Sequence, residues 1–183
     1  MKRFFLILLF CTISNLVTAQ DLVWETKILN AIERSNTEKK PIFLFFTGSD
    51  WCGWCIRLQN EVFKTPEFTA WAKDNVILVD LDFPRRTAQP EDVKAQNASL
   101  QQTFSVQGFP SIRIANAELK DGRINFDLLG GLGYAAGGPT VWLKSANEIL
   151  QLNKKDYTKK VVVVLPEPAK NEKKKVSKKL KKM

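Results

Sequence analysis

The sequence predicts an α/β domain in which a central mixed β-sheet is flanked by helices. Three observations carry this prediction. Two apolar runs, at residues 41–46 and 76–82, have the length of buried strands. Segments with helical spacing of apolar residues lie before, between and after them. Farther along, Asp121-Gly122 is a hairpin signal that joins two more strand-like segments. Right-handed crossovers would then place the parallel strands at the centre of the sheet.

The first half of the chain alternates helix and strand. Residues 22–40 are expected to form a helix that ends at the polar stretch before Pro41. After Cys55 the helical spacing continues to about Lys64, and Pro66 suits the first position of a new helix. The inward positions expected in these three helices are Val23, Trp24, Ile28, Leu29 and Ile32, then Leu58, Val62 and Phe63, then Phe68 and Trp71.

The second half begins with a loop, residues 83–90, that is longer than a compact connection needs. The elements expected after it are a helix at 91–104, strands at 111–115 and 123–128, a flexible glycine-rich connection at 130–138, and a helix at 140–152. The last helix should turn Val141, Trp142, Ile149 and Leu150 inward. The glycine-rich connection lacks the Lys-Ser/Thr pair of a phosphate-binding loop. Residues 161–165 fit either an extra edge strand or an extended linker.

Both ends of the chain are expected to lie outside a folded domain of residues 20–160. Residues 1–19 have the basic start, the apolar run and the small-residue end of a cleavable signal peptide. The apolar run is short for a membrane span, although an uncleaved anchor is the alternative. Lipid attachment at Cys11 is a weaker alternative, because Phe10 stands where a small residue is usual. Residues 161–183 are expected to be a linker and a disordered lysine-rich tail.

The net charge of +9 belongs to these ends of the chain. Lys2 and Arg3 lie in the signal peptide, and residues 169–183 contain eight lysines and one glutamate. The body between them is therefore close to neutral. The tail fits a solvated segment or one that contacts anionic surfaces. It has no interleaved aromatic residues for stacking on bases, so no nucleic-acid partner is expected.

The most informative stretch is Trp51-Cys52-Gly53-Trp54-Cys55, which follows the first apolar run directly. It places a dithiol where a helix should begin, and the unpaired N–H groups there stabilise a thiolate. Without the signal peptide these are the only cysteines, and the chain has no histidine. A zinc site would need two more ligands, and so short a disulfide loop adds little stability. The pattern favours a reactive pair over a metal site or an inert disulfide.

Together with Gly108-Phe109-Pro110-Ser111, this motif resembles the active site of the thioredoxin superfamily over residues 22–153. The resemblance implies a thioredoxin fold. It also implies that Cys52 is the nucleophile and Cys55 the resolving cysteine. Trp51, Gly53, Trp54, Phe109 and a cis-Pro110 would then contact the substrate. The alternatives are that both tryptophans only pack and that Pro110 is an ordinary turn proline.

The sequence departs from the family pattern at two places. No histidine lies between the cysteines, which favours a reducing protein over a disulfide-donating one. The buried acid that the resemblance implies six residues before the first cysteine is replaced by Phe46. Asp50 is expected to lie on an exposed loop. A water molecule or another carboxylate would then have to take the proton of Cys55, or resolution by Cys55 would be slow.

The chain is therefore expected to be a secreted, periplasmic thiol–disulfide oxidoreductase that reduces or isomerises disulfides of envelope proteins. It resembles bacterial secreted thioredoxin-like proteins, including a Glu61-Val62-Phe63 segment after the cysteines. No metal or cofactor is expected. A membrane-bound donor would supply electrons, because no flavin or nicotinamide fingerprint is present. The alternatives are a disulfide-donating oxidase and a thioredoxin-fold binding module anchored by its basic tail.

Overall fold

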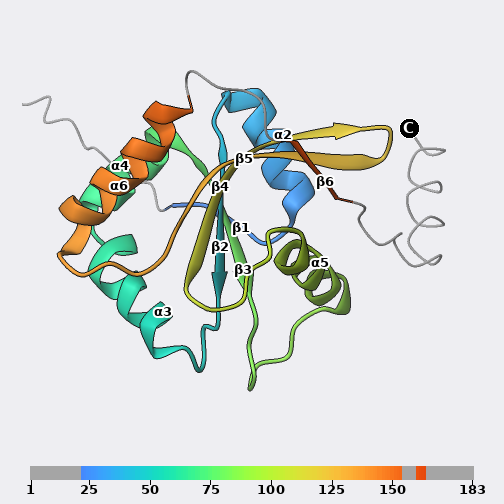
Figure 1. The fold of residues 1–183 in the computed structure, drawn as a ribbon. Helices are drawn as coiled ribbons and strands as arrows, with labels where there is room; N and C mark the ends of the chain where they lie inside the picture. Colours follow the sequence, from blue (N-terminus) through green and yellow to red (C-terminus); the bar gives the residue numbers. More distant parts are fainter. Residues whose placement is uncertain (1–21, 154–159, 164–183) are drawn as a thin grey trace, which may run out of the picture.

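The computed structural model describes residues 22–153 and the backbone of residues 160–163. The predicted signal peptide and the tail beyond residue 163 lie outside the described residues. Six strands form one mixed sheet in the order β1-β3-β2-β4-β5-β6 (Figure 1). The elements are β1 (Trp24–Glu25), α2 (Ile28–Glu38), β2 (Ile42–Thr47), α3 (Gly53–Leu58), the π-helix η2 (Gln59–Phe63), α4 (Pro66–Asn75), β3 (Ile77–Asp82), α5 (Glu91–Thr103), β4 (Ser111–Lys120), β5 (Arg123–Leu132), α6 (Gly138–Leu152) and β6 (Lys160–Val163).

The central strand β2 is buried at all six positions. It pairs in parallel with β3 on one side and antiparallel with β4 on the other. A strand covered on both faces reads as an unbroken apolar run, which explains the run that the sequence shows here. Successive side chains alternate between the two faces. Phe43 and Phe45 therefore point to one face, and Leu44 and Phe46 to the other.

Helices cover both faces of the sheet (Figure 1). We call the side covered by α3, η2, α4 and α6 the α3 face, and the side covered by α2 and α5 the α2 face. The α3 face is rich in aromatic rings that contact one another, and it also contains both cysteines of the C-x-x-C motif. These rings belong to Trp24, Phe43, Phe45, Phe63, Phe68, Trp71 and Trp142. The α2 face is mostly aliphatic.

The N-terminal segment differs from the prediction. Residues 22–27 are not helical: Trp24 pairs with Leu78 as part of β1, and α2 begins only at Ile28. This arrangement brings the Trp24 ring onto the aromatic cluster of the α3 face, whereas α2 covers the opposite face. The inward placement of Val23 and Leu29 was also wrong, because both are at least half exposed.

The glycine-rich segment is shorter than predicted. Gly130 and Gly131 lie in β5, opposite Ile114 and Arg113 of β4. A side chain at Gly130 would come within 2.9–3.1 Å of Ile149, so the strand needs glycine where α6 packs on it. The connection is therefore confined to residues 133–137, and α6 begins earlier than expected.

Two further outcomes concern α6 and the end of the chain. Val141 is 49 % exposed, so its predicted inward placement was wrong, whereas Trp142 is buried as expected.

Residues 160–163 form β6, which pairs antiparallel with β5, so the edge-strand alternative is the one observed. No helix within the described residues is long and apolar enough to cross a membrane.

Phe43→Ala should destabilise the protein strongly. The Phe43 ring contacts five other rings, including Trp24, Phe68 and Trp142, and it is fully buried. Removing a buried phenylalanine ring costs about 3–5 kcal/mol of the free energy of unfolding. Urea unfolding measures this loss. The control is Leu119→Ala, at a half-exposed position of β4, which should change stability by less than about 0.5 kcal/mol. Equal effects of the two substitutions would contradict the packing described.

Candidate active site

Cys52 and Cys55 are joined by a disulfide at the start of α3. The backbone N–H groups of Trp51 and Cys52 both donate to the carbonyl of Gly48, which folds the chain tightly between β2 and α3. Cys52 is the N-cap residue of α3, and its Sγ accepts a hydrogen bond from the Cys55 N–H at 3.2 Å. A sulfur at this position faces the positive end of the helix, which favours a thiolate there after reduction.

The two cysteines differ in accessibility. Cys52 is 6 % exposed and Cys55 is completely buried. Gly53, the first residue of α3, is exposed, and the space where its side chain would be is open. An incoming thiol or disulfide can therefore approach Cys52 but not Cys55.

Trp51 packs beside the disulfide and is held on several sides. Its Nε1–H donates to the carbonyl of Phe83 at 2.8 Å, and the guanidinium of Arg85 lies 3.7 Å from the ring centroid. A Cβ on Gly48 would lie only 2.5 Å from the ring, so this packing requires glycine there. The Phe109 ring contacts Trp51 at a centroid distance of 5.9 Å.

Two carboxylates hold the loop after β3 against the cysteine loop. The Asp82 carboxylate accepts hydrogen bonds from the N–H and the hydroxyl of Ser49. In return, the Asp50 carboxylate accepts from the backbone N–H groups of residues 85–87. The bond from the Arg85 N–H is the largest cause of a lowered pKa of Asp50. These bonds explain how a long loop stays ordered and keeps Arg85 over Trp51.

The Phe109–Pro110 peptide bond is cis and leads directly into β4. Both residues are half-buried. The Phe109 ring stacks on Phe83 at 5.0 Å and contacts Trp51. The segment after α5 and the loop after β3 therefore meet beside the disulfide, although they are far apart in the sequence.

On the other side of the cysteines, Trp54 is 56 % exposed and contacts Tyr134 at a centroid distance of 5.0 Å. The Arg57 guanidinium lies 5.5 Å from the Trp54 ring and 5.3 Å from the Tyr134 ring. Glu61 accepts hydrogen bonds from Arg57 at 2.7 Å and from the Tyr134 hydroxyl at 2.8 Å. The Arg57 bond lowers the pKa of Glu61, and the Glu61 bond raises that of Tyr134. We call Trp54, Arg57, Glu61 and Tyr134 the aromatic platform.

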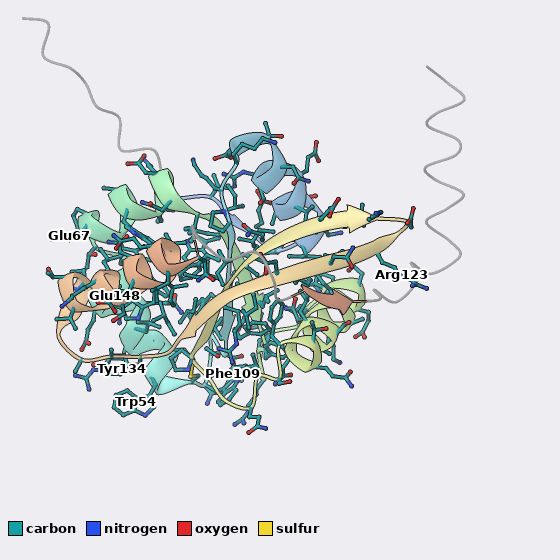
Figure 2. The ribbon with its side chains drawn as sticks, turned by 45° about the horizontal axis from the view of Figure 1, so that its top comes forward. Trp54, Glu67, Phe109, Arg123, Tyr134 and Glu148 are labelled. Carbon is teal, nitrogen blue, oxygen red and sulfur yellow. A yellow bond between two sulfur atoms is a disulfide. The ribbon has the colours of Figure 1, made fainter. Side chains whose placement is uncertain are left out.

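Figure 2 shows Trp54, Tyr134 and Phe109 at the same end of the molecule, around the start of α3. The sequence reasoning identified Trp54 and Phe109 but missed Tyr134, Arg57 and Arg85. The spacing of Arg57 and Glu61, one helical turn apart, was a signal for an ion pair. Tyr134 lies in the connection between β5 and α6, which the fold brings next to α3. No local sequence pattern predicts this contact.

Phe46, at the position where the resemblance implied a buried acid, does not face the cysteines. It points to the α2 face and contacts Phe104. Asp80 of β3 instead lies beside Phe45 in the sheet register. Burial raises the pKa of Asp80 to about 7, and the nearby charge of Asp82 adds to this shift. The sequence reasoning did not single out Asp80, although an aspartate inside a strongly apolar strand was a visible signal.

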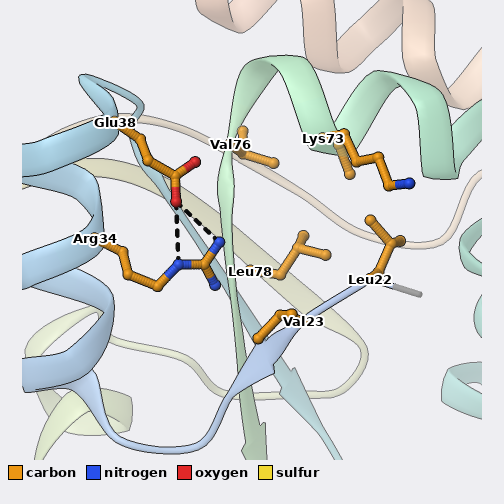
Figure 3. Close-up of a pocket in the computed structure, with 8 residues that line it drawn as sticks. Leu22, Val23, Arg34, Glu38, Lys73, Val76 and Leu78 are labelled. Atoms are coloured by element: carbon orange, nitrogen blue, oxygen red, sulfur yellow. Dashed lines mark hydrogen bonds and ion pairs between the residues drawn. The ribbon is translucent and has the colours of Figure 1, made fainter. Parts of the chain in front are cut away.

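A surface pocket of ≈ 270 Å³ lies away from the disulfide (Figure 3). Its lining includes Val76, which directly precedes β3, Leu78 near the beginning of that strand, and the ion pair between Arg34 and Glu38. The cysteine loop is bound instead to Asp82, at the other end of the same strand. This pocket is therefore not part of the site around the cysteines.

Gly48→Ala should displace Trp51, because the new methyl group overlaps the indole ring. Overpacking of this kind costs roughly 1–3 kcal/mol. The exchange of the Trp51 indole N–H with solvent, followed by NMR, should become faster as its bond to Phe83 is lost. Gly108→Ala is the control, because nothing lies near the added methyl group. An unchanged indole N–H signal in Gly48→Ala would contradict the packing described.

Comparison with known proteins places this geometry in a family. The model of the thioredoxin-like domain matches residues 29–132. The disulfide bond reductase DsbH of Chlamydia pneumoniae is 39 % identical over 136 residues, which cover 74 % of this chain and 77 % of the relative. The thioredoxin-related protein DsbJ of the same organism is 25 % identical over 103 residues, which cover 56 % of this chain and 30 % of DsbJ.

Solved structures agree with this placement. A DsbH oxidoreductase superposes with a TM-score of 0.67 at 34 % identity, covering 76 % of this chain and 91 % of that structure. A thioredoxin from Thermus thermophilus has a TM-score of 0.51 at 17 % identity, covering 74 % of this chain and 90 % of that structure, which shows the shared fold alone. The chain therefore belongs to the thioredoxin-like family and, as a homologue of the Dsb disulfide oxidoreductases, is a thiol–disulfide oxidoreductase.

Proposed function

We propose that the protein reduces, or isomerises, disulfides of other proteins through a cycle of Cys52 and Cys55. The observation that carries the proposal is the asymmetry of the pair: Cys52 is the N-cap of α3 and keeps 6 % of its surface exposed, whereas Cys55 is completely buried. This asymmetry supports Cys52 as the nucleophile and Cys55 as the resolving cysteine. The relative that is 39 % identical is itself called a disulfide bond reductase, which supports the reducing direction.

In the proposed cycle, the Cys52 thiolate attacks one sulfur of a substrate disulfide. A Cys52–substrate disulfide forms, and the other substrate sulfur leaves as a thiolate and takes up a proton. Cys55 loses its proton and attacks Cys52, so the second substrate thiol is released and the Cys52–Cys55 disulfide closes. Two electrons pass from the protein to the substrate. An external dithiol must then reduce the protein again.

Trp51, Gly53, Trp54, Phe109 and Pro110 are proposed to contact the substrate chain. Gly53 and Trp54 are exposed between the cysteines, and Phe109 and Pro110 border them from the start of β4. Trp51 contacts Phe109 and therefore closes one side of this surface. The aromatic platform lies on the other side of the cysteines and would bind apolar or aromatic side chains of an unfolded segment.

We also place this activity outside the cytoplasm. The support is the signal-peptide pattern at residues 1–19 and the homology to Dsb proteins. The substrates would then be envelope proteins, and a membrane-bound donor would supply electrons. A tail of eight lysines would contact anionic surfaces there.

Substitution of each cysteine tests the assignment. In the full chain, Cys52→Ser should abolish reduction of a protein disulfide, whereas Cys55→Ser should accumulate a covalent complex with its substrate. The reason is that only Cys52 attacks, and only Cys55 releases the product. Non-reducing gels and mass spectrometry detect the complex, and added dithiothreitol is the control that should dissolve it. A complex formed by Cys52→Ser instead would reverse the two roles.

Trp54→Ala should weaken the use of protein substrates more than that of a small disulfide. The exposed ring offers contact area to a chain, and loss of such an aromatic contact costs on the order of 1 kcal/mol or more. We expect kcat/KM to fall roughly fivefold to tenfold for a protein disulfide. With dithiobis(nitrobenzoate) it should change by less than about twofold.

The matched control is Ile56→Ala, a second exposed apolar residue of α3. It should leave both rates near those of the unsubstituted protein. Equal losses for the protein and the small disulfide in Trp54→Ala would mean that Trp54 acts on the dithiol rather than on substrate binding.

A further inference from the structure

Two buried polar side-chain atoms have no hydrogen-bond partner within the described residues. They are Oγ1 of Thr47, at the end of β2, and Oδ1 of Asp80, on β3. Buried polar groups are almost always hydrogen-bonded, so each exception in a native fold calls for an explanation. A buried carboxylate is the more costly of the two, because burial disfavours its charged form.

Asp80 lies on the α3 face of the sheet. Its neighbours along β3 alternate: Leu78 belongs to the α3 face, and Val79 and Leu81 belong to the α2 face. Asp80 is therefore on the same side as Leu78. Its register partner on β2 is Phe45, which packs in one cluster with both cysteines. The Asp80 side chain therefore lies on the face of the sheet that carries the cysteines, and its Oδ1 is buried.

The surroundings of Asp80 favour exchange of a proton near neutral pH. Phe45 packs beside it from β2, and the cysteines belong to the same face from α3. The ionisable group that acts on Asp80 is Asp82 of its own strand. After reduction of the disulfide, the two thiols add ionisable groups to the same face of the sheet. Desolvation, with the Asp82 charge added, raises the pKa of Asp80 to about 7. A group of this kind can both accept and return a proton at physiological pH.

The other carboxylates near the cysteines are already occupied. Asp50 accepts three backbone N–H groups, and Glu61 is bound by Arg57 and Tyr134. These bonds lower the pKa of both groups, which makes them poor proton acceptors. Asp82 is bound by Ser49. Asp80 alone among these four has a buried oxygen without a partner.

We propose that Asp80 accepts the proton of Cys55 when Cys55 resolves the mixed disulfide. The inference rests on the proposed function. In this step the Cys55 thiol gives its proton to the Asp80 carboxylate, directly or through one water molecule. The Cys55 thiolate then attacks Cys52 Sγ, a new Cys52–Cys55 bond forms, and the Cys52–substrate bond breaks. The leaving substrate thiolate takes a proton from solvent, and Asp80 later returns its own proton to solvent.

Stopped-flow reaction of the reduced full chain with dithiobis(nitrobenzoate) separates the two steps. Attack by Cys52 releases one nitrothiobenzoate, and resolution by Cys55 releases a second. In the unsubstituted protein the second rate should rise with pH through a midpoint near 7. Asp80→Asn should slow it by roughly tenfold or more at pH 7 and remove that midpoint, leaving only the alkaline rise of the thiol itself. The first rate should change by less than about twofold.

Asp127→Asn is the matched control, because it removes a carboxylate from β5 that is bonded to Asn116. It should leave both rates and the midpoint unchanged. A second phase with the same rate and pH profile in Asp80→Asn as in the unsubstituted protein would overturn the inference. Absence of the first phase in the unsubstituted protein would instead defeat the proposed function.

A second measurement needs no substitution, in case Asp80→Asn does not fold. Carbon-13 NMR of the aspartate carboxyls should show Asp80 titrating near neutral pH. Its midpoint should differ between the oxidised and the reduced protein, because the Cys55 thiol is present only after reduction. A midpoint that is the same in both states would show that the two groups are not coupled, and would contradict the proposed proton transfer.

Discussion

The site depends on one constraint: the sulfur of Cys52 must lie at the N-terminus of a helix that starts directly beyond the central strand. Strand β2 is buried on both faces, so its end is fixed by pairing with β3 and β4. The short loop after it returns to the Gly48 carbonyl and delivers Cys52 as the N-cap of α3. Helix dipole and free N–H groups then act on that one sulfur. The same geometry buries Cys55 one turn later.

The surroundings of the disulfide maintain this arrangement from both sides. On one side, Asp50 and Asp82 bind the two loops to each other, and Arg85 and Gly48 position Trp51. On the other side, the aromatic platform extends an exposed surface from α3 to the connection between β5 and α6. The aromatic core of the α3 face contains both cysteines, and Asp80 lies on the same face of the sheet with one buried carboxyl oxygen. The hydrogen bonds and ring contacts around the disulfide thus leave Cys52 slightly exposed and Cys55 completely buried.

Local patterns in the sequence were enough for the central strand, the two cysteines and the segment at Pro110, because each is carried by consecutive residues. Features that depend on distant pairing were not predictable in this way. Trp24 joins the sheet because it pairs with β3, and Gly130 lies in β5 where Ile149 of α6 packs closely against it. Counting residues back from Cys52 led to Phe46, yet neighbouring positions of a strand point to opposite faces. Only the register of β2 and β3 shows that Asp80 lies on the side of the cysteines.

The direction of electron flow is the central claim, and the reduction potential of the Cys52–Cys55 pair tests it most directly. The full chain is equilibrated with dithiothreitol or glutathione buffers, and the fraction of disulfide is measured by alkylation and mass spectrometry. A reductant without a histidine between its cysteines should have a potential near that of thioredoxin, about −270 mV. A potential near about −120 mV, typical of a strong oxidant, would contradict the reducing role and identify a disulfide donor.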